Sequence, residues 1–266
     1  MDRFDTMRVK EGESFSLPYA VKNASHFFAW DFFYGITPDN LRKTQIPGIY
    51  PLFRESISLK GLFCKNDVSL LEDSSFTLDG LVTDYCEDFS EMFSGQANLT
   101  VLNVGKFNTQ NGKNFARMFA DCAGITTLNV SNFNTSNATT FSGMFYNCKK
   151  VTTLDVSNFQ TSKVTTLNSM FYNCNNLTEL DLSNFDISSV MDVKNMLYGC
   201  YKIKTLDIRG WSADHFQLHL ANVENASAWT SLPNDCKIIT SKGSRMKSWI
   251  EWVTRESKNF TNIIEV

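Results

Sequence analysis

A 26-residue period runs through the middle of the chain without slippage, and it constrains the fold more than any other feature. A fixed period of about 20 to 50 residues is typical of solenoids, in which one supersecondary unit stacks on the next. Such a stack builds an extended surface, so the period favours binding over catalysis. The residue pairs that mark it are Met92-Phe93, Met118-Phe119, Met144-Phe145, Met170-Phe171 and Met196-Leu197.

Three further columns keep the same register and are expected to be buried. Four cysteines occupy one of them, where free cysteine acts as a small apolar residue, so we expect structural filler and no zinc or disulfide. The sequence leaves the state of Cys64, Cys86 and Cys236 open. The columns are Leu102, Leu128, Leu154, Leu180 and Leu206; Phe107, Phe133, Phe159, Phe185 and Trp211; and Cys122, Cys148, Cys174 and Cys200, with Gln96 in the matching place of the first full coil.

The coil at 151–176 predicts a short strand followed by a helix of about three turns. Leu154 and Val156 alternate with polar neighbours, which is the pattern of a strand with one buried face. Thr161-Ser162 then provides a helix-start signal, because short hydroxyl side chains accept bonds from the first N–H groups of a helix. Apolar residues follow in steps of three and four, which is the spacing of one helical stripe. They are Val164, Leu167, Met170, Phe171 and Cys174.

The expected fold is therefore an α/β solenoid, a curved leucine-rich-repeat stack of about five to six strand–helix coils. Strands lie about 4.8 Å apart and packed helices about 8 to 10 Å apart, so the sheet should line a concave side. Residues 1–72 are expected to form an N-terminal cap or attachment domain, and 73–211 the solenoid. Residues 212–266 are expected to form a capping segment, with strands at 237–240 and 261–266 around a helix at 244–253.

Several motifs recur together and resemble the BspA-like leucine-rich-repeat surface proteins. They are Leu-Asp-Val-Ser-Asn-Phe at 154–159, Thr-Ser-Lys-Val at 161–164 and Met-Phe-Tyr-Asn-Cys at 170–174. Phe159 and its column depart from the ladder asparagine of ordinary leucine-rich repeats. The segment after Trp211 looks like the tails of such repeat tracts in bacteriophage and prophage proteins, including tail-associated ones. The resemblance implies adhesion or surface recognition without enzymatic activity.

Composition and charge exclude other classes. A formal net charge of −3 gives no basic footprint, which argues against nucleic acid. No apolar stretch reaches the roughly 18 residues that cross a bilayer, so we expect no membrane insertion. The first residues lack an apolar signal segment, so we expect synthesis in the cytoplasm and action in a virion or at a cell surface. No phosphate loop or nucleophile elbow occurs, and we expect no enzyme, no cofactor and no metal; His215 and His219 are expected to be surface histidines.

The candidate binding surface consists of residues that flank the buried strand positions on the concave side. Its central column becomes more acidic along the stack, and like charges on neighbouring strands repel each other. Asp155, Asp181 and Asp207 therefore need solvent, a local donor or a cation, and carboxylate oxygens suit divalent ions. The candidate residues are Thr127, Asn129, Ser131, Thr153, Asp155, Ser157, Glu179, Asp181, Ser183 and Asp207.

The function expected from the period and the resemblance is recognition of a cell-surface protein or glycan, with the chain as a bacteriophage tail or fibre component. Two alternatives stay open. One is a structural spacer in a larger particle, with residues 1–72 contacting other virion subunits. The other is a cellular surface protein or interaction scaffold with no phage association.

Overall fold

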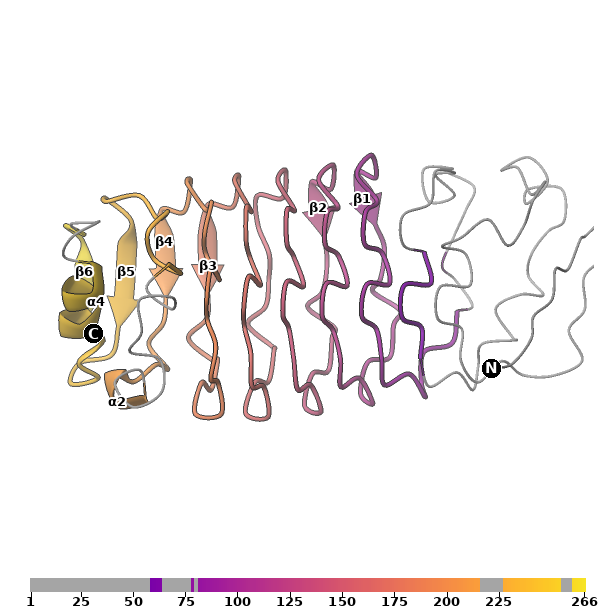
Figure 1. The fold of residues 1–266 in the computed structure, drawn as a ribbon, viewed down its shortest axis with the longest axis horizontal. Helices are drawn as coiled ribbons and strands as arrows, with labels where there is room; N and C mark the ends of the chain where they lie inside the picture. Colours follow the sequence, from indigo (N-terminus) through magenta and orange to yellow (C-terminus); the bar gives the residue numbers. More distant parts are fainter. Residues whose placement is uncertain (1–57, 64–77, 79–80, 216–226, 255–259) are drawn as a thin grey trace, which may run out of the picture.

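The computed structural model describes residues 58–63, 78, 81–215, 227–254 and 260–266. In this part of the chain, successive repeats lie side by side in sequence order along one axis (Figure 1). We term this arrangement the repeat stack. Two parallel ladders, one on each side of a repeat, join it to the next.

The first ladder contains the named strands, all paired in parallel. β1 (Val101–Leu102) pairs with β2 (Thr127–Leu128). A four-stranded sheet follows in the order β3 (Glu179–Asp181), β4 (Thr205–Asp207), β5 (Lys237–Thr240) and β6 (Ile263–Glu265). The second ladder consists of single parallel bridges that join Ser58, Asp88, Asn114, Thr140, Thr166 and Asp192 in that order. From Asp88 onward, every bridge of this ladder joins residues one period apart.

The predicted helix in each repeat is wrong, because the segment after the second ladder is a run of turns. The N–H groups of Met92 and Ser94 donate to carbonyls three residues back. Those of Glu91, Phe93 and Gly95 donate instead to the next repeat, over 2.8–2.9 Å. A helix needs each N–H bonded four residues back, and here every second N–H belongs to the neighbouring repeat.

Left-handed backbone recurs twice in every one of these segments and excludes a continuous right-handed helix. Arg117, Gly143 and Ser169 have φ of 56°, 60° and 54°. Four residues later, φ is again positive at Asp121, Asn147 and Asn173. Asparagine, aspartate and glycine accept this conformation more readily than other residues. The apolar steps of three and four thus describe a chain of tight turns.

Because the described repeats contain no helical layer, the difference in spacing that was expected to curve the stack is absent from them. With parallel ladders on both sides, the two sides of a repeat share the same spacing of about 4.8 Å. The described repeats follow a nearly straight line (Figure 1). The candidate binding surface is therefore an extended face of the stack, without the concavity that strand–helix coils would produce.

Phenylalanine ladders fill the core between the two sides. In one of them the ring centroids are 5.5–5.7 Å apart and the rings are within 11° of parallel. All four predicted columns are buried, as expected. Gln96 donates to the carbonyl of Phe63, so it makes the kind of contact that the cysteines of its column make. The ladder comprises Phe63, Phe93, Phe119, Phe145 and Phe171.

Buried polar side chains also join the repeats. The thiols of Cys122, Cys148, Cys174 and Cys200 each donate to a carbonyl of the preceding repeat over 3.1–3.2 Å. A column of threonines, Thr83, Thr109, Thr135 and Thr161, donates to carbonyls of the following repeat over 2.8–3.2 Å. The expected helix-start role of Thr161 is wrong, because its hydroxyl bonds to the carbonyl of Asp186. These bonds satisfy polar groups that burial would otherwise leave without a partner.

The N-terminal end of the described stack differs from the expected domain limit, and the C-terminal end has the expected order of elements. Ser58 pairs with Asp88, so the second ladder reaches into the range assigned to the N-terminal domain. At the other end, β5, α4 (Met246–Thr254) and β6 occupy the segment where a strand, a helix and a strand were expected. A short helix, α2 (Ala213–His215), precedes them. Cys86 and Cys236 are free and buried, and Cys64 lies outside the described residues.

Candidate functional site

The ten candidate residues line the first ladder in three parallel columns, which we term the polar face. The outer column contains Thr127, Thr153 and Glu179, the central column Asn129, Asp155, Asp181 and Asp207, and the turn column Ser131, Ser157 and Ser183. Leu128, Leu154 and Leu180 are buried beneath them. The outer column and all of the central column except Asp207 are exposed, and the serines are half-buried.

Local donors hold the central column in place. Oδ1 of Asp155 accepts hydrogen bonds from the Ser157 backbone N–H at 3.1 Å and from its hydroxyl at 2.6 Å. Oδ1 of Asp181 accepts from the Ser183 backbone N–H at 2.9 Å. Asn129 makes the same contacts with Ser131. Such side chain–backbone turns are a usual role of aspartate and asparagine, and they fix each side chain before any partner arrives.

Asp207 differs from the rest of its column. It is only 8% exposed, and its Oδ2 lies 2.8 Å from an Arg209 guanidinium nitrogen. The Arg209 Nε donates to both carboxylate oxygens over 3.0 Å. Hydrogen bonding to Asp207 and its charge raise the pKa of Arg209. Asp207 was expected to be a binding residue, but it is largely buried and paired with Arg209, which leaves Asp155 and Asp181 as the exposed carboxylates of the central column.

No group of three histidine, cysteine, aspartate or glutamate side chains lies close enough in the described ranges to hold an ion. His219 lies outside those ranges. Among the helices that the structure describes, none has the length and apolar character to cross a bilayer.

A second surface feature, a stack of tyrosines, was not predicted from the sequence. Tyr146, Tyr172 and Tyr198 stack with ring centroids 4.6 and 5.1 Å apart, and we term them the tyrosine ladder. The Arg117 guanidinium lies 5.1 Å from the Tyr146 ring centroid, at one end of the ladder. The tyrosines follow the second ladder in each repeat, so they belong to the turn segment that was expected to be helical.

An amide row runs beside the tyrosine ladder. Asn173 Nδ2 donates to Asn147 Oδ1 at 2.9 Å, and Asn147 Nδ2 donates to Asp121 Oδ1 at 2.7 Å. Arg117 pairs with Asp121 at 3.0 Å and closes the row. The sequence signal was the repeated Tyr-Asn within Met-Phe-Tyr-Asn-Cys, a motif that was used above only for the family resemblance.

Two parallel ladders and in-register columns define the chain as a repeat protein. The model of a Mycoplasma protein family of unknown function, DUF285, matches residues 58–153 and again 126–235. The chain belongs to this family, which is related to the BspA-like repeat proteins. The first match begins at Ser58, the first residue of the second ladder. Neither the curated proteins nor the solved structures contain a significant match.

Proposed function

We propose that the chain is a non-enzymatic recognition protein, a repeat solenoid whose polar face binds a cell-surface protein or glycan. The observation that carries the proposal is the alignment of polar side chains at equivalent positions of consecutive repeats, where each is a hydroxyl, an amide or a carboxylate. An extended partner meets polar side chains at the same three positions at each step of about 4.8 Å. Extended recognition surfaces of this kind are the usual use of stacked repeats.

Preorganisation supports the same role. Asp155 and Asp181 are fixed by the serine two residues ahead, so binding does not have to order them. Side-chain ordering at an interface opposes association by about 0.5 to 1.5 kcal/mol for each flexible side chain. Carboxylates held in one orientation are good acceptors for sugar hydroxyls and for protein N–H groups alike.

The test is a pair of double variants of the full chain, Asp155→Asn with Asp181→Asn, and Asp155→Ala with Asp181→Ala. The amide variant retains Oδ1 as an acceptor, as Asn129 does in the same column, and removes only the charge. Binding of labelled protein to intact cells and to immobilised glycans is then measured. At least tenfold weaker binding by the amide variant, with an unchanged thermal midpoint, supports the polar face. Full binding by both variants contradicts it.

A structural spacer is the second candidate, because the stacked phenylalanines and buried polar ladders make a stiff rod. It predicts that the amide variant keeps every activity of the wild type. We also propose the phage association that the resemblance of the segment after Trp211 implies. Genes for tail and lysis proteins beside this one would support a virion component, and genes for cellular surface proteins would contradict it.

A further inference from the structure

We infer that the tyrosine ladder and the lysines beside it bind an acidic polysaccharide, a sugar polymer that carries carboxylate or sulfate groups. The inference rests on the proposed recognition role and gives a partner class to a second surface, separate from the polar face. It involves the turns at 149–150, 175–176 and 201–202, which we term the lysine edge.

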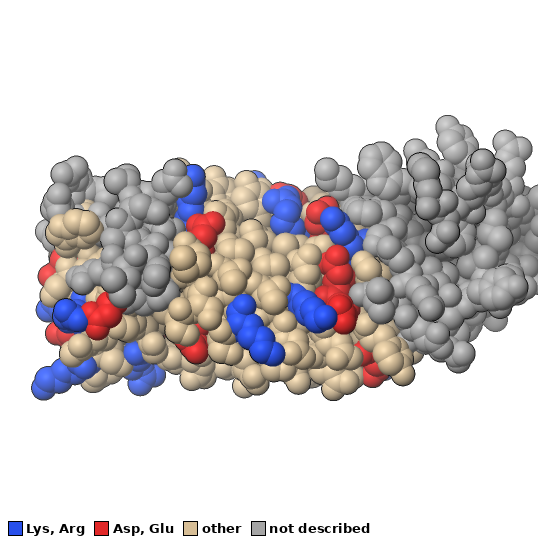
Figure 2. Space-filling model, turned by 60° about the horizontal axis from the view of Figure 1, so that its bottom comes forward, with Lys and Arg blue, Asp and Glu red and all other residues tan. Residues whose placement is uncertain are grey.

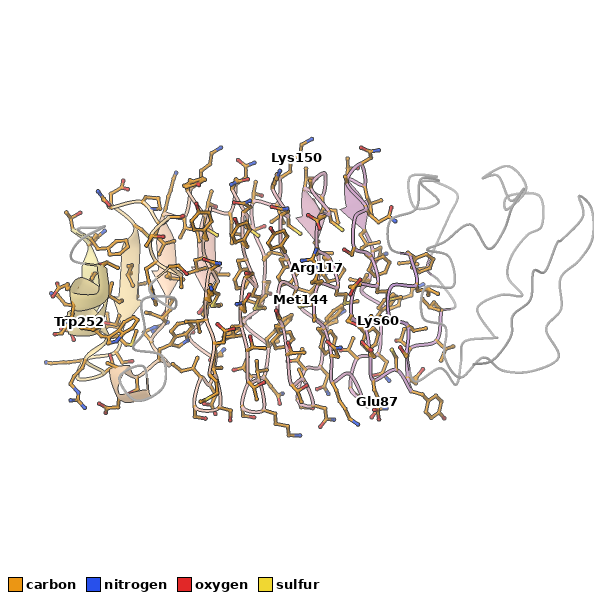
Figure 3. All side chains as sticks on the ribbon, in the orientation of Figure 1. Lys60, Glu87, Arg117, Met144, Lys150 and Trp252 are labelled. Carbon is orange, nitrogen blue, oxygen red and sulfur yellow. The ribbon has the colours of Figure 1, made fainter. Side chains whose placement is uncertain are left out.

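The charge of this edge has the opposite sign to that of the whole chain. The formal net charge is −3, yet every charged residue in the three turns is a lysine. Lys149, Lys150 and Lys202 are exposed, as is Lys204 just beyond the last turn. Lys150 extends outward at one edge of the stack, and Glu87 lies at the opposite edge (Figure 3). A local field of one sign attracts a polymer of the other sign.

The opposite edge shows no such segregation. Acidic and basic side chains are interspersed where that edge is turned forward (Figure 2). Lys113 lies 2.8 Å from Glu87 there, so its charge is balanced locally. Lys163, in the turn at 162–163, also belongs to this side of the repeat.

Hydrogen bonds between repeats hold the lysine edge in order. Asn176 Nδ2 donates to the Lys149 carbonyl at 2.8 Å. Lys202 Nζ donates to Asn176 Oδ1 at 2.6 Å. The three turns therefore form one continuous row along the stack, with lysines in the first and last turns.

The tyrosine ladder supplies the apolar and hydroxyl contacts that a sugar polymer needs. Each of its three tyrosines lies two residues before the ladder cysteine and three before a turn of the lysine edge. Tyr198 is 37% exposed, and Tyr201, within the last turn, is 56% exposed. Burial first, and then Tyr146, Tyr198 and Tyr201, raise the pKa of Tyr172. Tyrosine gives large amphipathic contact area with little loss of side-chain entropy.

The spacing of the rings also suits a polysaccharide. Ring centroids 4.6 and 5.1 Å apart repeat at about the length of one sugar ring in an extended chain. Single-stranded nucleic acid needs aromatic faces open to the bases, but these rings cover one another. A membrane surface favours apolar side chains between the basic ones, whereas amides of Asn147, Asn173 and Asn176 lie here. The arrangement favours a sugar polymer over both.

The experiment compares two double variants of the full chain that remove the same charge. Lys150→Gln with Lys202→Gln alters the lysine edge, and Lys113→Gln with Lys163→Gln alters the opposite edge. The control is matched, because Lys163 Nζ donates to Asn137 Oδ1 at 2.8 Å. Lys202 Nζ makes the equivalent bond to Asn176 Oδ1, and in both pairs the two residues are one period apart. The probes are heparin, hyaluronan, neutral dextran, single-stranded DNA and phosphatidylserine vesicles, and binding is measured by calorimetry at low and physiological salt.

Wild type should bind heparin or hyaluronan and not dextran, and the Lys150/Lys202 variant should lose at least tenfold in affinity while the control variant loses less than twofold. Tyr198→Ala should weaken binding further without changing its salt dependence, because it removes contact area and no charge. Equal losses from both lysine variants, or tighter binding to DNA or vesicles than to either polysaccharide, overturn the inference. Cell binding that depends on Asp155 and Asp181, without any binding of acidic polysaccharide, overturns this inference and leaves the proposed function intact.

Discussion

The buried threonine column gives the sharpest test of how the repeats are held together. Thr135 is 1% exposed. Its hydroxyl donates to the Gln160 carbonyl at 3.2 Å and accepts from the Gln160 backbone N–H at 2.7 Å. Thr135→Val keeps the shape of the side chain and removes both bonds. The Gln160 backbone then loses both of these partners at a part-buried site.

The expected loss follows from the two bonds. Each contributes about 1 kcal/mol net, so the free energy of unfolding should fall by about 2 kcal/mol. For a chain of this size, that corresponds to a midpoint lowered by about 4 to 8 °C. The sign is diagnostic, because replacing an unpaired buried hydroxyl with a methyl group would instead stabilise the protein.

Urea denaturation followed by far-ultraviolet circular dichroism measures the effect. Thr165→Val is the matched control, since its hydroxyl is exposed and its bond to the Thr139 carbonyl is 3.4 Å long. The control should change the free energy of unfolding by less than about 0.5 kcal/mol. A Thr135→Val protein as stable as this control, or more stable than wild type, would refute the assigned role of the threonine column.

Three further outcomes are expected. Phe145→Ala should lower the free energy of unfolding by about 3 to 5 kcal/mol in urea titrations, because a fully buried side chain is lost and a cavity remains, and Phe145→Leu should lower it far less; similar effects of the two would contradict the close-packed, buried position of this side chain. Burial raises the pKa of Cys122 to about 12, so above about pH 9 this thiol is deprotonated only in the unfolded chain. The free energy of unfolding should therefore fall by up to about 1.4 kcal/mol for each pH unit above about 9. In Cys122→Ala, the plot of unfolding free energy against pH should be shallower by that amount. Asp155→Ala should lower stability by about 1 kcal/mol through loss of its turn bonds while Asp155→Asn lowers it by less, and identical midpoints for the two would contradict the local-donor role.

The sequence was sufficient to identify what is buried. Every predicted column of methionine, phenylalanine, leucine and cysteine lies in the core, because the period alone places equivalent residues at equivalent depths. It was not sufficient to identify the backbone between them. Val164, Leu167 and Met170 have helical spacing, but tight turns of three residues produce the same spacing. The N–H groups that decide between the two bond to another repeat, which no local pattern records.

Some features that were not predicted do have a signal in the sequence, but the signal can be interpreted only once the fold is known. Asn147 and Asn173 are residue types that accept left-handed backbone, and they recur at one position of the turn segment. In a parallel, in-register stack, equivalent side chains lie directly against one another. Tyr146, Tyr172 and Tyr198 therefore had to stack once the helix was replaced by a ladder. The pairing of Asp207 with Arg209 depends on side-chain geometry, which residue spacing does not determine.

The constant register of the bridges allows the molecule to change in length by whole repeats. Each bridge from Asp88 to Asp192 joins residues one period apart, and the central repeats each bring a ring (Phe119, Phe145, Phe171), a hydroxyl (Thr109, Thr135, Thr161) and a thiol (Cys122, Cys148, Cys174) to the ladders. A duplicated repeat would find every partner already in place and would move the two ends of the molecule apart by about 4.8 Å. The identical Met-Phe-Tyr-Asn-Cys segments at 144–148 and 170–174 are natural crossover points for such a duplication. Reach can thus change in fixed steps over generations, while the surface that each step displays stays the same.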